Sequence, residues 1–89
     1  MEQYRKAFVD VLVRHSTSGK QKPAAILYDD GRTYEIEKVT ACFMAKASKI
    51  GGEMALRYTI QVLGQETYLY EKEGLFFVEA KVRNQLCRT

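Results

Sequence analysis

The run TYEIEKVTACFMA, residues 33–45, decides how this chain folds, because it is too long for one straight strand of a small sheet. Its apolar side chains change from even to odd positions along the run: Tyr34 and Ile36, then Val39, Ala41 and Phe43. Strand side chains alternate between two faces, so such a change of phase requires an extra residue or a bend. We expect a bulge or sharp bend near Glu37 and Lys38 that curls a sheet towards a barrel.

Shorter runs rich in Val, Ile, Tyr, Phe and Thr flank this segment, and these residue types favour a pleated, half-buried surface. They cover residues 7–14, 24–28, 54–63, 67–70 and 75–78. The run 54–63 predicts a strand with one apolar face, formed by Leu56, Tyr58, Ile60 and Val62. Asp29-Asp30-Gly31-Arg32, between two runs, has the composition of a hairpin turn.

These runs predict an all-β protein, a small antiparallel barrel or strongly coiled sheet of five to six strands. We favour a Src-homology-like barrel over the OB type, which usually carries a helix between its third and fourth strands. Here that connection is a loop containing Gly51 and Gly52. We expect residues 1–89 to form a single domain with its core in 7–79, and 80–89 to be a tail or a short C-terminal helix.

The chain has 89 residues, of which 46% are hydrophobic and 28% are charged, which is typical of one globular domain. No apolar run approaches the length of about 20 residues that spans a bilayer. The first residues, MEQYRK, are not followed by the apolar core of a secretion signal. We therefore expect a cytoplasmic protein that does not associate with membranes.

The net charge of +3 is mild, but charges of like sign cluster along the chain. Residues 1–22 carry five basic and two acidic residues, whereas 29–37 carry four acidic residues and one basic. Residues 38–49 then hold three lysines and no acid. The sequence leaves open whether these blocks fold into separate faces or into a neutral mosaic. A dedicated nucleic-acid binder would usually be more basic than this chain.

The sequence has no pattern that is typical of catalysis or of metal binding. Its two cysteines, Cys42 and Cys87, are far apart, and His15 is the single histidine, so a zinc site is not expected. Cys42 lies within an apolar stretch and is predicted to be a small buried residue. Phosphate-binding glycine loops and nucleophile elbows are also missing. We expect a non-enzyme without cofactor or metal.

Basic and aromatic residues interleave along the chain in a way that resembles a platform for single-stranded nucleic acid. The cations that would neutralise phosphate are Arg14, Lys20, Lys22, Arg32 and Arg57. The rings that would stack with bases are Tyr58, Tyr68 and Tyr70. The simpler interpretation is that the loop around Lys20 is only solvated and that most aromatic residues fill the core of a small barrel.

Most of residues 9–79 resemble a group of small bacterial proteins in which a proline precedes a β-run that ends in Asp-Gly-Arg. The matching positions here are Pro23, Asp30-Gly31-Arg32, Tyr34, Ile36, Arg57-Tyr58-Thr59, Glu66, Tyr68-Leu69 and Phe77-Val78-Glu79. These are largely turn and core residues, and no activity is established for the group. The resemblance therefore implies a discrete fold and no mechanism.

The leading hypothesis is a non-catalytic binding module whose ligand is nucleic acid. The alternative is a protein-interaction or homo-oligomerising module, which pairs through an edge strand such as the one opened by Pro23 or the last one. Apolar residues on both faces of the first strand motivate this alternative. A third hypothesis is a small ligand in the mouth of the barrel, which requires an apolar pocket.

Overall fold

The computed structural model describes residues 3–28 and 30–81, which form seven β-strands and one short 3-10 turn. The elements are β1 (Tyr4–His15), β2 (Gln21–Leu27), β3 (Thr33–Glu35), β4 (Lys38–Ala47), η1 (Ser48–Ile50), β5 (Glu53–Val62), β6 (Gln65–Lys72) and β7 (Leu75–Lys81). The prediction of an all-β protein is confirmed. The prediction of five to six strands is wrong by one, because the run 33–45 is divided into β3 and the greater part of β4.

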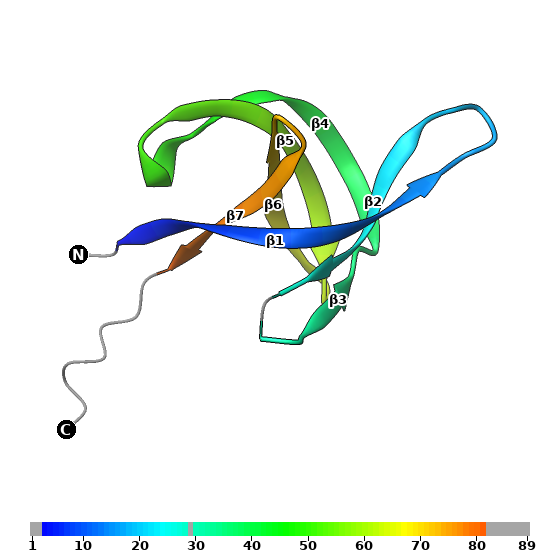
Figure 1. The fold of residues 1–89 in the computed structure, drawn as a ribbon, viewed down its shortest axis with the longest axis horizontal. Helices are drawn as coiled ribbons and strands as arrows, with labels where there is room; N and C mark the ends of the chain where they lie inside the picture. Colours follow the sequence, from blue (N-terminus) through cyan, green and yellow to red (C-terminus); the bar gives the residue numbers. More distant parts are fainter. Residues whose placement is uncertain (1–2, 29, 82–89) are drawn as a thin grey trace.

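All seven strands belong to one antiparallel sheet with the order β3-β2-β1-β7-β6-β5-β4. The sheet curls into a half-barrel, so that its two edge strands, β3 and β4, are joined by the residues Ile36 and Glu37 (Figure 1). The predicted bend is confirmed at this place. The strand that contains Pro23 and the last strand, suggested above as edges, instead have neighbours on both sides.

Both faces of the sheet bury apolar side chains. The first, here called the Ile60 face, carries a core of Val9, Ile26, Ile60 and Leu69. The second, the Phe77 face, carries a smaller core of Ala47, Ala55, Tyr70 and Phe77, against which Ile50 of η1 packs. The predicted apolar face of β5 belongs to the Ile60 face. The other side of β5 is not simply solvated, because Ala55 and Thr59 are buried there.

A bulge in the pairing of β1 with β2 accommodates Pro23 inside the sheet. The register between β1 and β2 shifts between Leu12 and Val13, and Pro23 lies opposite Val13 at this irregularity. A proline lacks the amide hydrogen that a regular ladder needs, so a bulge is a tolerated place for it inside a sheet.

β7 continues through Ala80 and Lys81, so a helix beginning at residue 80 is excluded. Residues 82–89 lie outside the described residues.

Within residues 3–28 and 30–81, no helix has the length and the apolar character that crossing a membrane requires.

Candidate nucleic-acid interface

Five residues of the Phe77 face lie directly opposite one another in register, one on each of five neighbouring strands. In order across β1, β7, β6, β5 and β4 they are Phe8, Phe77, Tyr70, Arg57 and Phe43. The two ends of this row are accessible, since Phe8 is 55% exposed and Phe43 is 49% exposed. Phe77 and Tyr70 in the middle are buried and stack at 5.3 Å between ring centroids. The row therefore has a rigid, buried centre and aromatic rings at both ends.

Arg57 lies against two exposed rings near one end of this row. Its guanidinium carbon is 4.9 Å from the ring centroid of Phe43 and 4.2 Å from that of Tyr68. A guanidinium near an aromatic face is attracted by the ring quadrupole. Arg57 Nε is buried and makes no hydrogen bond within residues 3–28 and 30–81. We call Phe43, Arg57 and Tyr68 the Arg57 stack.

The second group of predicted residues lies at the end of the β1–β2 hairpin, which projects from the body of the sheet (Figure 1). Arg14 and Lys22 are directly opposite in register, and Lys20 is in the connecting turn. None of the three forms an ion pair in the described part of the chain. Like charges directly opposite on neighbouring strands are destabilising, so this hairpin end favours an anion.

The remaining predicted residues do not join these two groups. Arg32 turns back onto Asp30: its amide donates to Asp30 Oδ1 at 2.9 Å, and its Nε lies 3.4 Å from Oδ2. Tyr58 belongs to the Ile60 face and donates its hydroxyl to Glu71 Oε1 at 3.1 Å. Tyr70 is 2% exposed, and its hydroxyl donates to Glu79 Oε1 at 3.2 Å. A base cannot stack on Tyr70 in this arrangement.

The prediction that Cys42 is buried is wrong, since this residue is exposed on β4. It faces Tyr58 in register on the neighbouring strand β5. Partial desolvation of the thiol and the nearby carboxylate of Glu71 raise the pKa of Cys42, although a hydrogen bond with Tyr58 opposes this shift. A raised pKa reduces the thiolate fraction and hence the nucleophilicity of the side chain.

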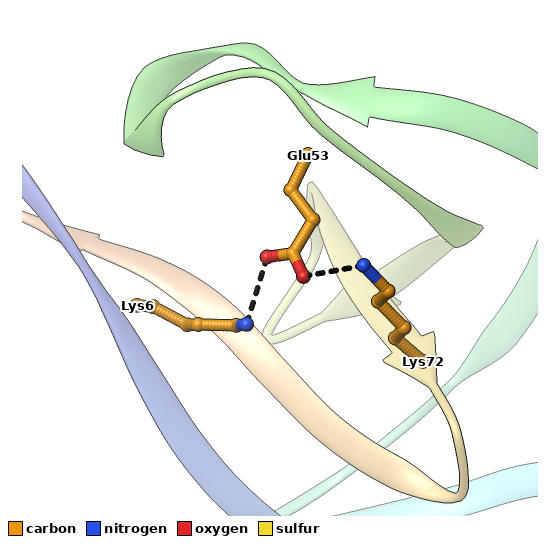
Figure 2. A network of polar contacts seen from close by, with 3 residues as sticks. All are labelled: Lys6, Glu53 and Lys72. Atoms are coloured by element: carbon orange, nitrogen blue, oxygen red, sulfur yellow. Dashed lines mark hydrogen bonds and ion pairs between the residues drawn. The ribbon is translucent and has the colours of Figure 1, made fainter.

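A carboxylate bridge ties three strands together at the other end of the Phe77 face. Glu53, at the start of β5, accepts from Lys6 Nζ at 2.7 Å and from Lys72 Nζ at 2.8 Å (Figure 2). Lys6 comes from β1 and Lys72 from β6, and Lys6 Nζ also lies 4.6 Å from the ring centroid of Phe77. The bridge holds the end of the β4–β5 hairpin over the sheet. Sequence reasoning missed it, because the three residues are far apart in the chain.

The sequence-based set of site residues also omitted Phe43, which lies opposite Arg57 in register and forms one side of the Arg57 stack. Only the register of β4 against β5 places them together. No group of three or more His, Cys, Asp or Glu side chains within residues 3–28 and 30–81 is arranged to hold a metal ion.

Comparison of the chain with protein-family models, with curated proteins and with solved structures finds no match in any of the three. Function is therefore inferred from the residues that the fold brings together. These are the Arg57 stack on the Phe77 face and the cations Arg14 and Lys22, which face each other at the hairpin end.

Proposed function

We propose that the protein binds single-stranded nucleic acid without catalysis, through the Arg57 stack and the end of the β1–β2 hairpin. The observation that carries this proposal is the placement of one arginine against two exposed aromatic rings, Phe43 and Tyr68. We also propose that the half-barrel is of the Src-homology type, and that the protein is bacterial and cytoplasmic.

Each part of the surface has a separate physical task. Exposed rings stack with bases of any sequence, and such a contact contributes about 1–3 kcal/mol per base. Arg57 keeps the two rings in place and adds positive charge beside them. Arg14 and Lys22 attract phosphate groups, because an anion between them offsets their mutual repulsion.

Fluorescence anisotropy with labelled single-stranded and double-stranded oligonucleotides, at about 50 and 200 mM salt, tests the proposal. We expect tighter binding of the single strand and a marked loss of affinity at the higher salt. Each phosphate contact with a single strand lowers the logarithm of the binding constant by about 0.7 per tenfold increase in salt concentration. Binding that does not depend on salt, or no binding at either salt, would contradict the proposal.

Variants then separate the two tasks. Phe43→Ala and Tyr68→Ala should each weaken binding at both salt concentrations, by about 1–3 kcal/mol where the ring stacks with a base. Arg14→Glu combined with Lys22→Glu should weaken binding mainly at low salt and reduce the salt slope. Leu75→Ala and Lys46→Glu are matched controls, because both residues are exposed and lie outside the two groups.

The second candidate function is a protein-interaction or self-associating module. It is favoured by two exposed apolar residues of β1 on one face, Phe8 and Leu12, of which Phe8 lines an open cavity of about 600 Å³. Light scattering over a wide range of protein concentration tests self-association. A single monomeric species throughout would contradict a homo-oligomer, and Phe8→Ser should abolish any dimer observed.

A further inference from the structure

β6 and β7 share a tight turn but separate soon after it. Their register covers Tyr70–Lys72 against Leu75–Phe77, and it ends there. β6 pairs with β5 over residues 65–71, and β7 pairs with β1 over residues 76–81. Residues 65–69 and 78–81 therefore have a paired strand on one side only, within the described part of the chain. Figure 1 shows the two strands diverging from their common turn. The sheet is therefore split between β6 and β7.

A cavity of about 230 Å³ lies in this split, because both strands contribute to its lining. Thr67 and Tyr68 line it from β6, and Val78, Glu79 and Ala80 line it from β7. Its other walls include the core residue Ile26, the partly buried Val62 and the Tyr28–Tyr34 pair, whose rings meet edge to face with 5.5 Å between their centroids. A larger cavity of about 630 Å³ shares Tyr28, Tyr34, Val62, Thr67 and Ala80. We call the two together the β6–β7 cleft.

The backbone of β6 presents an open strand edge to this cleft. Residues of an antiparallel strand alternate in the side to which their amide and carbonyl groups point. A two-residue turn, Glu73-Gly74, joins Lys72 to Leu75, and in such a hairpin the backbone groups of the closing pair face each other. The amide and carbonyl groups of Lys72 and Tyr70 thus point to β7, and those of Tyr68 and Glu66 point to the same side. No strand within residues 3–28 and 30–81 pairs with this part of the edge. Such an edge is complementary to another extended backbone.

We propose that the β6–β7 cleft binds one extended segment of another protein, which adds to β6 as a strand and places an apolar side chain in the cavity. Alternate residues of an added strand point to the same side, so one side chain can enter between Ile26, Val62 and Val78. β7 closes the far side of the cleft. The space therefore suits a single strand and not the sheet edge of a second copy.

Charge favours acidic residues on either side of that apolar residue. Arg32, Lys49 and Lys81 line the cleft, against the two acids Asp30 and Glu79. Asp30 and Arg32 pair with each other, and Glu79 accepts hydrogen bonds from Tyr70 and from the amide of Lys49. The three cations still outnumber the two acids, so the lining keeps an excess of positive charge. A segment with glutamates beside its apolar residue is therefore a better match than one with lysines.

Amide hydrogen exchange, followed by NMR on the full chain, tests the premise first. The Tyr70 amide, which faces its partner on β7, should exchange slowly, whereas the Tyr68 amide should exchange faster by about tenfold or more. Equal protection of the two amides would show that the edge is already covered, and it would overturn the proposal.

Binding is then tested with the peptides acetyl-Glu-Thr-X-Thr-Glu-amide, in which X is Val, Ile, Leu, Phe or Tyr. At least one should slow exchange of the Tyr68 amide by about tenfold, while its counterpart with lysines or with an N-methylated X should not. If none of the five does so, or if only an oligonucleotide shifts the Tyr68 and Glu79 amides, the proposal is wrong.

A blocking variant separates binding in the cleft from binding elsewhere. Thr67→Trp introduces a large side chain at an exposed β6 position that lines both cavities. It should reduce peptide affinity by about tenfold or more, because the ring occupies the space that the apolar residue X needs. Thr33→Trp, at an exposed β3 position outside the cleft, is the matched control and should leave peptide binding unchanged. Equal effects of the two variants would place the peptide elsewhere.

Discussion

Ile36 and Glu37 are neighbours in the chain, but their amide groups donate to different parts of the curled sheet. Ile36 N donates to Ala24 O of β2 at 2.9 Å, and Glu37 N donates to Gln61 O of β5 at 2.7 Å. One peptide step thus carries the chain from one edge of the sheet to the other. At this point two backbone hydrogen bonds hold the two sides of the curled sheet together.

Glu37→Pro should destabilise the protein, because proline has no amide hydrogen to donate to Gln61 O. An acceptor left without its donor costs about 1–3 kcal/mol of unfolding free energy. Glu37→Ala is the matched control, since it keeps the amide and removes only the bonds from Gly64 N to the carboxylate, at 3.2 and 3.3 Å. Urea denaturation measures both. Equal losses would mean that the backbone bond contributes little.

Leu63→Asn should stabilise the β5–β6 hairpin. Leu63 and Gly64 form its two-residue turn with φ of 53° and 75°, and Asn is far better suited than Leu to the first position of such a turn. Leu63 is 75% exposed, so little packing is lost. Leucine in the left-handed region costs about 1 kcal/mol or more, and asparagine tolerates this conformation much better. Recovery of part of this cost should raise the melting temperature by about 4 °C.

The same hairpin offers the opposite change as a control. Gly64→Ala should lower the melting temperature, because an alanine at φ of 75° is strained. No atom lies within 4 Å of the position that its Cβ would take, so the loss would report backbone conformation and not a clash. An unchanged melting temperature in both variants would show that the turn does not limit stability.

Some features of this fold can be predicted from the sequence, and others depend on which strands become neighbours. Alternation of side chains was enough to predict the bend after Ile36 and the apolar face of β5, because both depend on neighbours in the chain. The split between β6 and β7 was not predictable, because it depends on which strand each edge meets. Burial of Cys42 was predicted wrongly for the same reason: β4 is an edge strand, and its apolar residues are not all covered.

The candidate site divides in the same way. Arg57 and Tyr68 stood out by residue type, and the structure brings them into contact. Tyr58 and Tyr70 have the same residue type, but one lies on the other face and one is buried. Residue type identified what can stack with a base, whereas strand register decides which ring is available.

Acid should destabilise the protein through Glu53. Hydrogen bonds from Lys6 and Lys72 hold the pKa of Glu53 below its ordinary value of 4.5 in the folded protein. The unfolded chain therefore takes up this proton first as the pH falls, so the stabilising contribution is complete above about pH 4.5 and is lost at lower pH. Thermal denaturation from pH 7 to pH 3 should show a smaller decrease for Glu53→Gln than for the unmodified protein.

The control for this change is Glu66→Gln, which removes an exposed carboxylate that forms no ion pair within residues 3–28 and 30–81. Its melting temperature should follow that of the unmodified protein through the same pH range. If Glu53→Gln does so as well, the bridge between β1, β5 and β6 does not contribute to stability.

The contact between Phe43 and Arg57 should stabilise the fold as well as form part of the proposed site. A double-mutant cycle with Phe43→Leu and Arg57→Met removes the ring and the charge but keeps apolar side chains of similar length. For a guanidinium carbon 4.9 Å from the ring centroid at a partly exposed position, we expect a coupling of about 0.5–1 kcal/mol in unfolding free energy. Arg57→Met alone should cost less than this geometry suggests, because it also removes the buried Nε that makes no hydrogen bond in the described chain. A coupling of zero would mean that the ring and the guanidinium are neighbours without measurable attraction.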